Sequence, residues 1–303
     1  MSYTNKEPGL YNYDGLLLKT WDTLLQEKDI IMKDSLLYRC ERDLEGNLVI
    51  DDSVNIISDS AFQHCGGLYS IVIPNTVTRI ERGAFAMCTG LQSTVIPDYI
   101  TNIPDHAFSG CIYLQSITLP SALERIGNHA FDSCTGLESI TIPNTVISIG
   151  ERAFQSCTSL QDIDIPTSVI DIGEYAFKSC RNLQTVDIPN SITVLKVGTF
   201  DGCENLKSII IPDSVISIEK SAFRLCKNLK SIKLPDFITK IAEFTFSECF
   251  RLKSIRIPSA VTCIEDYAFN ACTSLCTISF PQSVKDVGEY AFYDCLLIQT
   301  KNN

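Results

Sequence analysis

The chain has 303 residues, of which 45% are hydrophobic and 20% charged, a composition that favours a folded protein with a large core over a disordered one. Its net charge of −11 at pH 7 argues against a general nucleic-acid binder, because such a protein needs a basic surface to displace the counterions of phosphate groups. The same charge argues against broad docking on anionic membranes. The sequence contains no run of about 18 apolar residues, the length that a membrane-spanning helix requires.

The first residues, MSYTNKEPGLYNYDG, lack the basic and apolar segments of a secretory signal. Taken alone, this favours an intracellular protein, unless a signal has been removed. Just after them, Leu17, Trp21, Leu24 and Leu25 recur at helical spacing, and Asp14 is a suitable N-cap. We therefore expect a helix with Trp21 in its buried face.

Residues 35–50, SLLYRCERDLEGNLVI, are expected to form a hairpin around Glu45–Asn47. Helix and hairpin together predict an N-terminal cap over residues 1–47. The remaining residues, 48–303, are expected to form one repetitive domain.

That domain repeats every 23 residues without insertion or deletion. A Phe marks each repeat, a Cys follows three residues later, and an I-x-I segment that usually ends in Pro comes next. The Phe residues are Phe62, Phe85, Phe108, Phe131, Phe154, Phe177, Phe200, Phe223, Phe246, Phe269 and Phe292. A period of this length with an L-x-x-I-x-I pattern is typical of a leucine-rich-repeat solenoid of about eleven repeats, in which no repeat can bury its apolar face alone.

Each repeat predicts one short strand and one return segment. In residues 114–120, LQSITLP, Leu114, Ile117 and Leu119 should point inward, and Pro120 should end the strand because it cannot donate to a ladder. Residues 121–134 should return through a turn containing Gly127 and a helical turn. The fold class is thus a repeat solenoid with a curved parallel β-sheet on the concave face and short helical turns and loops on the convex face.

The consensus L-x-S-I-x-I-P-x-S-V-x-x-I-g-x-x-A-F-x-x-C resembles the BspA-like (Treponema-type) leucine-rich repeats, over about residues 48–300. Residues 139–160, SITIPNTVISIGERAFQSCTSL, carry the resemblance clearly. It implies a curved solenoid and a surface or adhesion protein that binds host or matrix proteins. The cell surface is thus the location that the resemblance suggests.

The cysteine that follows each Phe could be a nucleophile, a metal ligand, half of a disulfide or a buried wedge. These residues are Cys65, Cys88, Cys111, Cys134, Cys157, Cys180, Cys203, Cys226, Cys249, Cys272 and Cys295. Side chains stacked in register run parallel, which disfavours disulfides, and the absence of C-x-x-C removes the common zinc spacing. We expect this Cys column to consist of buried, unreactive thiols.

Three cysteines lie outside that column. Cys40 should belong to the core of the cap, whereas Cys263 and Cys276 occupy positions that other repeats fill with polar residues. Both are expected on the surface, where a thiol is either reactive or incidental.

Histidine is scarce, with only His64, His106 and His129. His106 and His129 are one repeat apart, and Asp105 lies beside them. Two His and one Asp could hold a metal, but we favour accidental adjacency and predict no metal site and no cofactor.

The concave face has the most informative pattern, because its outward residues change along the repeats. An acidic cluster is followed by a basic patch. The acidic cluster consists of Asp162, Asp164 and Asp187, and the basic patch of Lys207, Lys230, Lys233, Lys253 and Arg256. Like charges stacked in register cost up to about 1 kcal/mol per pair, and a pattern with such a cost often marks a functional surface. The alternative is that Glu219, Glu243 and Glu265 neutralise the patch and nothing binds.

We therefore predict a non-enzymatic interaction protein whose concave face binds a protein or glycan partner through these eight residues. A structural alternative is self-assembly through the apolar C-terminal end formed by Leu296, Leu297 and Ile298. A more distant alternative is a hydrolase, because Asp164 and Asp187 should lie near 5 Å apart, a separation found in paired glycosidase carboxylates. We favour neither alternative over binding. The hydrolase is the less favoured of the two, since an open sheet offers no pocket that would raise the pKa of one carboxyl.

Overall fold

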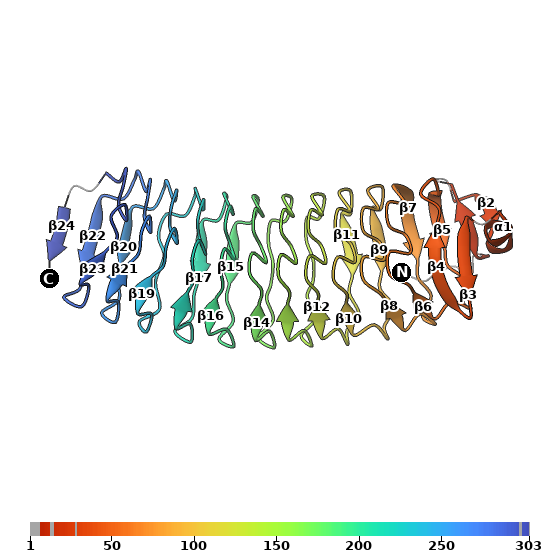
Figure 1. Ribbon diagram of the computed structural model, residues 1–303, viewed down its shortest axis with the longest axis horizontal. Helices are drawn as coiled ribbons and strands as arrows, with labels where there is room; N and C mark the ends of the chain where they lie inside the picture. Colours follow the sequence, from red (N-terminus) through yellow and green to blue (C-terminus); the bar gives the residue numbers. More distant parts are fainter. Residues whose placement is uncertain (1–6, 13–14, 28, 297–298, 303) are drawn as a thin grey trace. The chain divides into compact units, whose positions relative to one another are not determined.

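The computed structural model describes residues 7–12, 15–27, 29–296 and 299–302, with the backbone alone for Tyr38 and 299–302. The chain divides into two compact units, Met1–Val146 and Ile147–Asn303. Each unit is built from stacked turns of 23 residues, which Figure 1 shows from the side. The predicted division into a cap (1–47) and a solenoid (48–303) stays a prediction.

The unit Met1–Val146 contains one short helix and twelve strands among the described residues. They are β1 (Gly9–Tyr11), β2 (Leu17–Thr20), α1 (Trp21–Gln26), β3 (Ile30–Lys33), β4 (Leu36–Cys40), β5 (Glu45–Val49), β6 (Ile56–Ile57), β7 (Gly67–Val72), β8 (Arg79–Ile80), β9 (Ser93–Val95), β10 (Asn102–Ile103), β11 (Ser116–Thr118) and β12 (Arg125–Ile126). Strands β5, β7, β9 and β11 pair in parallel, and so do β4, β6 and β8.

The unit Ile147–Asn303 contains twelve strands among its described residues. They are β13 (Ser148–Ile149), β14 (Asp171–Ile172), β15 (Thr185–Asp187), β16 (Val194–Leu195), β17 (Ser208–Ile210), β18 (Ser217–Ile218), β19 (Lys240–Ile241), β20 (Ser254–Arg256), β21 (Cys263–Ile264), β22 (Thr277–Phe280), β23 (Asp286–Val287) and β24 (Gln299–Asn302). All of the pairs within this unit are parallel, as expected for strands related by one repeat.

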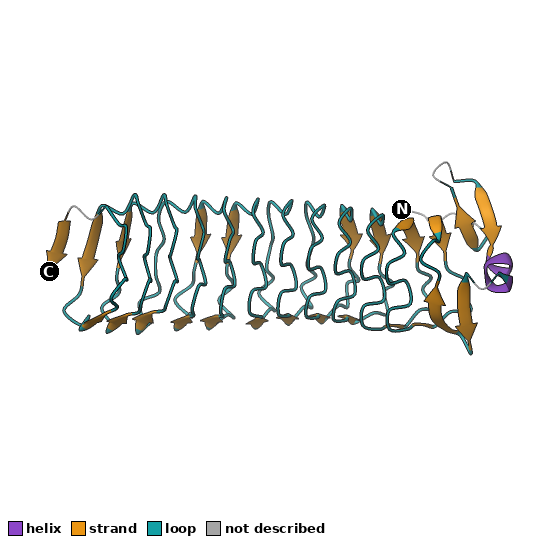
Figure 2. Ribbon diagram, turned by 45° about the horizontal axis from the view of Figure 1, so that its top comes forward, coloured by secondary structure: helices purple, strands orange, loops and turns teal. Residues whose placement is uncertain are grey.

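The predicted parallel strands are confirmed. Every turn from β6 to β23 carries a two-residue strand on one side, and most turns carry a longer strand of the I-x-I type on another; the I-x-I segments at 139–143, 162–166 and 231–235 form no named strand. Figure 2 shows the two rows of strands joined by loops. In β11, Ile117 is buried while Ser116 and Thr118 are exposed, and Leu119 just beyond the strand is half-buried. The side of the I-x-I strands whose residues are exposed is called the I-x-I face below.

The helical turns expected on the convex side are absent from the described repeats. Ser221, Phe223 and Leu225 each donate their N–H to a carbonyl of the next repeat, at 2.9–3.0 Å. Ser221 and Leu225 have left-handed backbones, with φ of 59° and 60°. Each of these two features excludes an α-helix, because the N–H groups of a helix bond within the helix and its φ values are negative.

The helix of the N-terminal region is shorter than predicted. It begins at Trp21, and its N-cap is Thr20, whose side chain accepts a hydrogen bond from the N–H of Thr23. Leu17 lies in β2 instead, because β2 pairs antiparallel with β1. The predicted N-cap, Asp14, lies outside the described residues. Trp21 is buried, as expected for a residue of the cap core.

The hairpin predicted around Glu45–Asn47 is wrong in its strand pairing. The hairpin joins β3 and β4 around Asp34 and Ser35, which both have left-handed backbones. Strand β5 pairs with β1 and β7 in the other sheet. The period-2 pattern of residues 35–50 shows two strands, but strand pairing depends on partners far away in the sequence.

The interior of both units is a stack of identical side chains. Within Ile147–Asn303, the rings of Phe177, Phe200 and Phe223 lie 5.5 and 5.8 Å apart between centroids, with interplanar angles of 6°. The Phe residues that mark the repeats are at most 1% exposed from Phe62 to Phe269. This Phe column explains why the repeat length never varies, since one extra residue would move a ring out of the stack.

Candidate functional site

The I-x-I face of Ile147–Asn303 is formed by strands that alternate between buried and exposed residues. Val186, Ile209 and Ile255 point into the core, and their neighbours point outward. All eight predicted site residues are exposed on this side. They are Asp162, Asp164, Asp187, Lys207, Lys230, Lys233, Lys253 and Arg256.

The acidic cluster is brought together by the register of the strands. Asp162 forms a parallel bridge with Thr185. Asp164 therefore lies beside Asp187 on the next turn, at the spacing of about 4.8 Å that separates neighbouring strands. Both carboxylates are exposed. Water thus solvates both carboxylates.

The basic patch also follows the register. The N–H of Lys253 donates to the carbonyl of Lys230 at 3.2 Å, so these two lysines lie on adjacent turns. The N–H of Lys207 donates in the same way to the carbonyl of Gln184 at 2.9 Å. Lys207, Lys230 and Lys253 thus occupy one column, and Lys233 and Arg256 occupy the outward column of the I-x-I segment.

The charges of the basic patch are only partly satisfied within the protein. Lys207 donates to the side-chain oxygen of Gln184 at 2.8 Å, and Lys233 lies 3.6 Å from a carboxylate oxygen of Asp213. No carboxylate of the described residues lies within 4.0 Å of the charged nitrogens of the others, which are Lys230, Lys253 and Arg256.

The three acids that could have neutralised the patch have other partners. Glu219 accepts a hydrogen bond from the N–H of Val197. Glu243 pairs with Lys220, and Glu265 pairs with Lys240, each at 2.6 Å. Partial burial alone would raise the pKa of the Glu265 carboxyl. The ion pair with Lys240 and the hydrogen bond from the N–H of Glu243 outweigh burial and hold that pKa below its ordinary value.

One exposed apolar residue on this face was not among the predicted site residues. Ile210 lies beside Asp187 in the register of β15 and β17, and 64% of its surface is exposed. Interfaces bury apolar side chains at their centre and place charges around them. The signal was present in the sequence, because Ile210 stands alone among charged residues in the outward column.

The Cys column is buried from Cys65 to Cys272, as predicted, whereas Cys295 at its end is only half-buried. The buried members of the column are at most 1% exposed, and all fourteen cysteines are free. The sulfur of Cys203 donates to the carbonyl of Phe177 at 3.2 Å, and this bond recurs along the column. Burial raises the pKa of Cys180 to about 12, so these thiols are protonated and unreactive.

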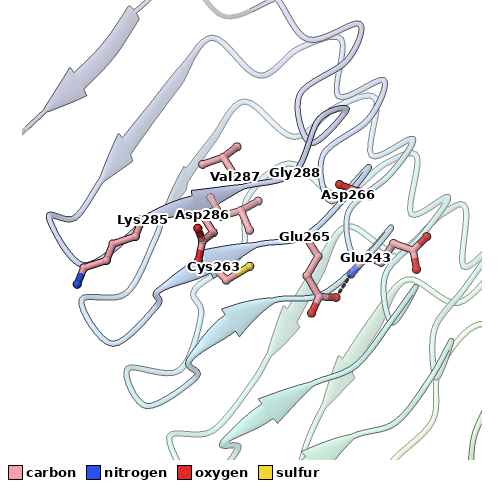
Figure 3. A pocket seen from close by; sticks show the side chains of 9 residues that line it. Glu243, Cys263, Glu265, Asp266, Lys285, Asp286, Val287 and Gly288 are labelled. Carbon is pink, nitrogen blue, oxygen red and sulfur yellow. Dashed lines mark hydrogen bonds between the residues drawn. The ribbon is translucent and has the colours of Figure 1, made fainter.

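Cys263 lies in a shallow hollow of about 560 Å³ on the side of the shorter strands, shown in Figure 3. It is half-buried rather than exposed, and so is Cys276. Partial burial and the neighbouring carboxylates of Glu265 and Asp286 raise the pKa of the Cys263 thiol. A raised pKa disfavours the thiolate, so the hollow does not activate this cysteine.

His106 and His129 lie on adjacent turns, as predicted, and their rings stack at 4.6 Å between centroids. Nδ1 of His129 lies 2.9 Å from Asp132, while Asp105 accepts a hydrogen bond from the N–H of Asn128. Among the described residues, no three His, Cys, Asp or Glu side chains are arranged to hold a metal ion.

Of the predicted C-terminal apolar end, Leu296 is 60% exposed, whereas Leu297 and Ile298 lie outside the described residues. No helix in the described part of the chain is long and apolar enough to cross a membrane.

Comparison with known proteins extends these observations. The profile described as "BspA type Leucine rich repeat region (6 copies)" matches residues 31–135, 124–224 and 195–302. No curated protein shows significant similarity to the chain.

Several solved structures are similar. A leucine rich cell surface protein from Faecalibacterium prausnitzii is 30% identical, with a TM-score of 0.60, over 90% of this chain and 85% of that one. A leucine-rich repeat protein from Bacteroides ovatus is 27% identical, with a TM-score of 0.51, over 89% and 92% of the two chains. The pneumococcal vaccine antigen PcpA, 22% identical over 86% and 76%, shares the fold with a TM-score of 0.62. The repeat, the parallel strands and the profile agree, and the chain belongs to the BspA-type leucine-rich repeat family.

Proposed function

We propose that the protein is a non-enzymatic interaction module that binds an acidic protein or glycan partner through the I-x-I face of Ile147–Asn303, the side expected to be concave. The observation that carries the proposal is the set of Lys230, Lys253 and Arg256, which stand close together without a carboxylate within 4.0 Å among the described residues. Unpaired like charges repel one another, and a partner with acidic groups would relieve that repulsion.

Ile210 and the acidic cluster complete the proposed surface. Ile210 supplies an apolar contact, and Asp162, Asp164 and Asp187 lie on the turns that precede it. A partner would therefore meet negative, apolar and positive groups in sequence along the repeats. Such a pattern fixes the orientation of a partner as well as its affinity.

The similarity to a cell surface protein of F. prausnitzii supports a surface location and an adhesion-type role. Leucine-rich repeat proteins are in general binding rather than catalytic proteins, and both members of the Asp164–Asp187 pair are exposed. These points favour binding over hydrolysis.

The test is binding of the purified protein to a panel of purified matrix proteins and sulfated glycans, measured by biolayer interferometry at low salt. Replacing both Lys230→Glu and Lys253→Glu should abolish any binding that the basic patch mediates. The matched control replaces Lys240→Glu and Lys285→Glu, which changes the net charge equally on the side of the shorter strands.

Loss of binding in the first variant but not in the control would support the proposal. Equal binding by both variants, or equal loss in both, would refute the basic patch as the site. Unfolding should not confuse the outcome, because the double variant turns the like-charge pair at positions 207 and 230 into an opposite-charge pair and keeps one like-charge pair at positions 230 and 253, so stability should change little.

A further inference from the structure

One column of turn residues has a left-handed backbone in successive repeats, at every 23rd residue from Ser60, with φ between 51° and 61° through Tyr267. In Met1–Val146 this left-handed column consists of Ser60, Gly83, His106 and His129. In Ile147–Asn303 it consists of Arg152, Tyr175, Gly198, Ser221, Phe244 and Tyr267. Tyr290 occupies the next position of the 23-residue period but lacks the positive φ. Because the backbone conformation repeats, the side chains leave the turns in the same direction.

Planar side chains in this column stack wherever two adjacent repeats carry them. Tyr267 lies 4.9 Å from Phe244 and 5.1 Å from Tyr290, with interplanar angles of 10° and 15°. His106 and His129 lie 4.6 Å apart at 10°. The left-handed column is thus a series of positions at ring-stacking distance.

In Met1–Val146 the stack of rings stops at His106, because the preceding residue of the column is Gly83. A hollow of about 480 Å³ lies there, a size common for small-molecule sites. Ser60, Gly83 and Ala86 line it, together with His106, Arg82 and Met87. One ring of the stack faces this hollow.

A glycine in the column does not by itself leave open space. At Gly198, a Cβ atom would meet the ring of Tyr175 at 2.3 Å, so that ring covers the glycine. At Gly83, the nearest atoms would be Ser60 Oγ at 3.4 Å and Ala86 Cβ at 3.9 Å. No ring among the described residues covers Gly83, although the backbone there matches that of the ring-bearing positions.

The imidazole of His106 is held in place on one side and can stack against a further ring on the other. One face of its imidazole is covered by His129, and His129 is held by Asp132. Burial, His129 and Arg82 together lower the pKa of His106, so the imidazole is neutral at pH 7. The positive charge beside the hollow therefore comes from Arg82.

The Arg82 guanidinium favours an anion on its side of the hollow. No carboxylate of the described residues lies within 4.0 Å of the Arg82 guanidinium. Asp59, the acid that also lines the hollow, accepts a hydrogen bond from the hydroxyl of Ser60 at 2.7 Å. A guanidinium without a partner offers two parallel donors to a carboxylate.

We propose that this hollow binds a small planar aromatic acid, whose ring continues the stack on His106 and whose carboxylate pairs with Arg82. The ring takes the place on His106 that Phe244, one repeat earlier, takes on Tyr267, and the small residues Ser60, Gly83 and Ala86 leave room for it. This site is separate from the basic patch and does not depend on it.

Indole-3-acetate is a suitable probe, and its binding to the full chain can be followed by calorimetry and by the imidazole NMR signals of His106. Two matched ligands separate the contribution of the planar ring to the affinity from that of the carboxylate. Cyclohexylacetate keeps the carboxylate without a planar ring, and indole-3-acetamide keeps the ring without the charge. Each should bind at least about fivefold more weakly, the size expected for loss of one aromatic stack or one exposed charge pair.

Gly83→His should abolish binding, because a third imidazole would extend the stack into the hollow at a φ that His106 already adopts. Arg82→Gln should weaken binding about fivefold, while Arg79→Gln, a control at an arginine paired with Glu81, should not. His106→Phe should retain binding and His106→Ser should lose it. Equal binding of cyclohexylacetate, unchanged affinity in Gly83→His, or no binding of indole-3-acetate at millimolar concentration would each overturn the proposal.

Discussion

The Phe column and the left-handed column follow the same 23-residue period and both stack rings, yet one is uniform and the other varied. In the Phe column of Ile147–Asn303, Phe200 lies between two other rings and is fully buried. In the left-handed column, Phe244 stacks on Tyr267 but is only half-buried, and Ser221 stands one repeat before it. The backbone register produces both stacks, and burial alone decides whether the residue type can change.

This difference separates the parts of the protein that maintain the fold from those that can acquire ligands. A buried ring lost from a stack leaves a cavity that the neighbouring turns cannot fill. A ring lost from the surface is replaced by water. Substitutions along an exposed column therefore cost little folding stability. Both proposed sites lie where the residue type of an exposed column changes from one repeat to the next.

The largest effect is expected from Phe200→Ala. It should lower the free energy of unfolding by about 3–5 kcal/mol, because it removes a ring buried between two others. Phe244→Ser is the matched change in the left-handed column and should cost only about 0.5–1.5 kcal/mol, since Ser221 shows that serine accepts this backbone. Both are measured by chemical denaturation, and equal costs would contradict the comparison.

An intermediate effect is expected in the Cys column. Cys203→Ala removes a buried sulfur and its bond to the carbonyl of Phe177, and should cost about 1–2 kcal/mol. The control, Cys263→Ala, changes a half-buried thiol and should stay within about 0.5 kcal/mol. Denaturation under reducing conditions measures both. Loss of partner binding in a folded Cys203→Ala protein would show that the thiols serve more than packing.

The smallest effect concerns pH and the stacked histidines. Because the folded state lowers the pKa of His106, the unfolded chain binds a proton more readily, and stability should fall as the pH drops below about 6.5. His129, Arg82, Asp105 and Asp132 set this pKa together with burial. The His106→Asn variant should lose this part of the pH dependence, as measured by denaturation at pH 5 and pH 8. An identical pH profile in the variant would exclude His106 as the source.

The repeat could be read from the sequence because every turn is the same length. The buried Phe, Cys and Leu positions, the parallel strands and the exposure of Lys230 and Asp164 all follow from period and alternation. The N-terminal region could not be read in this way. Its spacing predicts a helix at Leu17 and a hairpin for residues 35–50, and both predictions are wrong because local spacing does not show that β1 lies between β2 and β5.

The return segment shows a second limit of the sequence. Ala130 and Phe131 suggest a helical turn by residue type, but the N–H groups of such segments bond to the next repeat instead. Two left-handed residues per repeat make this possible, and they include Ser, His, Tyr and Glu as well as Gly. Residues of these types give no local sign of a left-handed backbone, so the left-handed column was not predicted.

The sequence by itself determined the repeat length, the family, the buried columns and the order of charges along the I-x-I strands, because these depend only on positions within an invariant period. Tertiary structure decided which charges remain unpaired, which thiols donate hydrogen bonds, which rings stack, and where a column leaves open space. The ring of Tyr175 covers Gly198, whereas no ring in the described chain covers Gly83, and both are simply glycine in the sequence. That distinction depends on the direction of a neighbouring side chain, which no repeat pattern specifies.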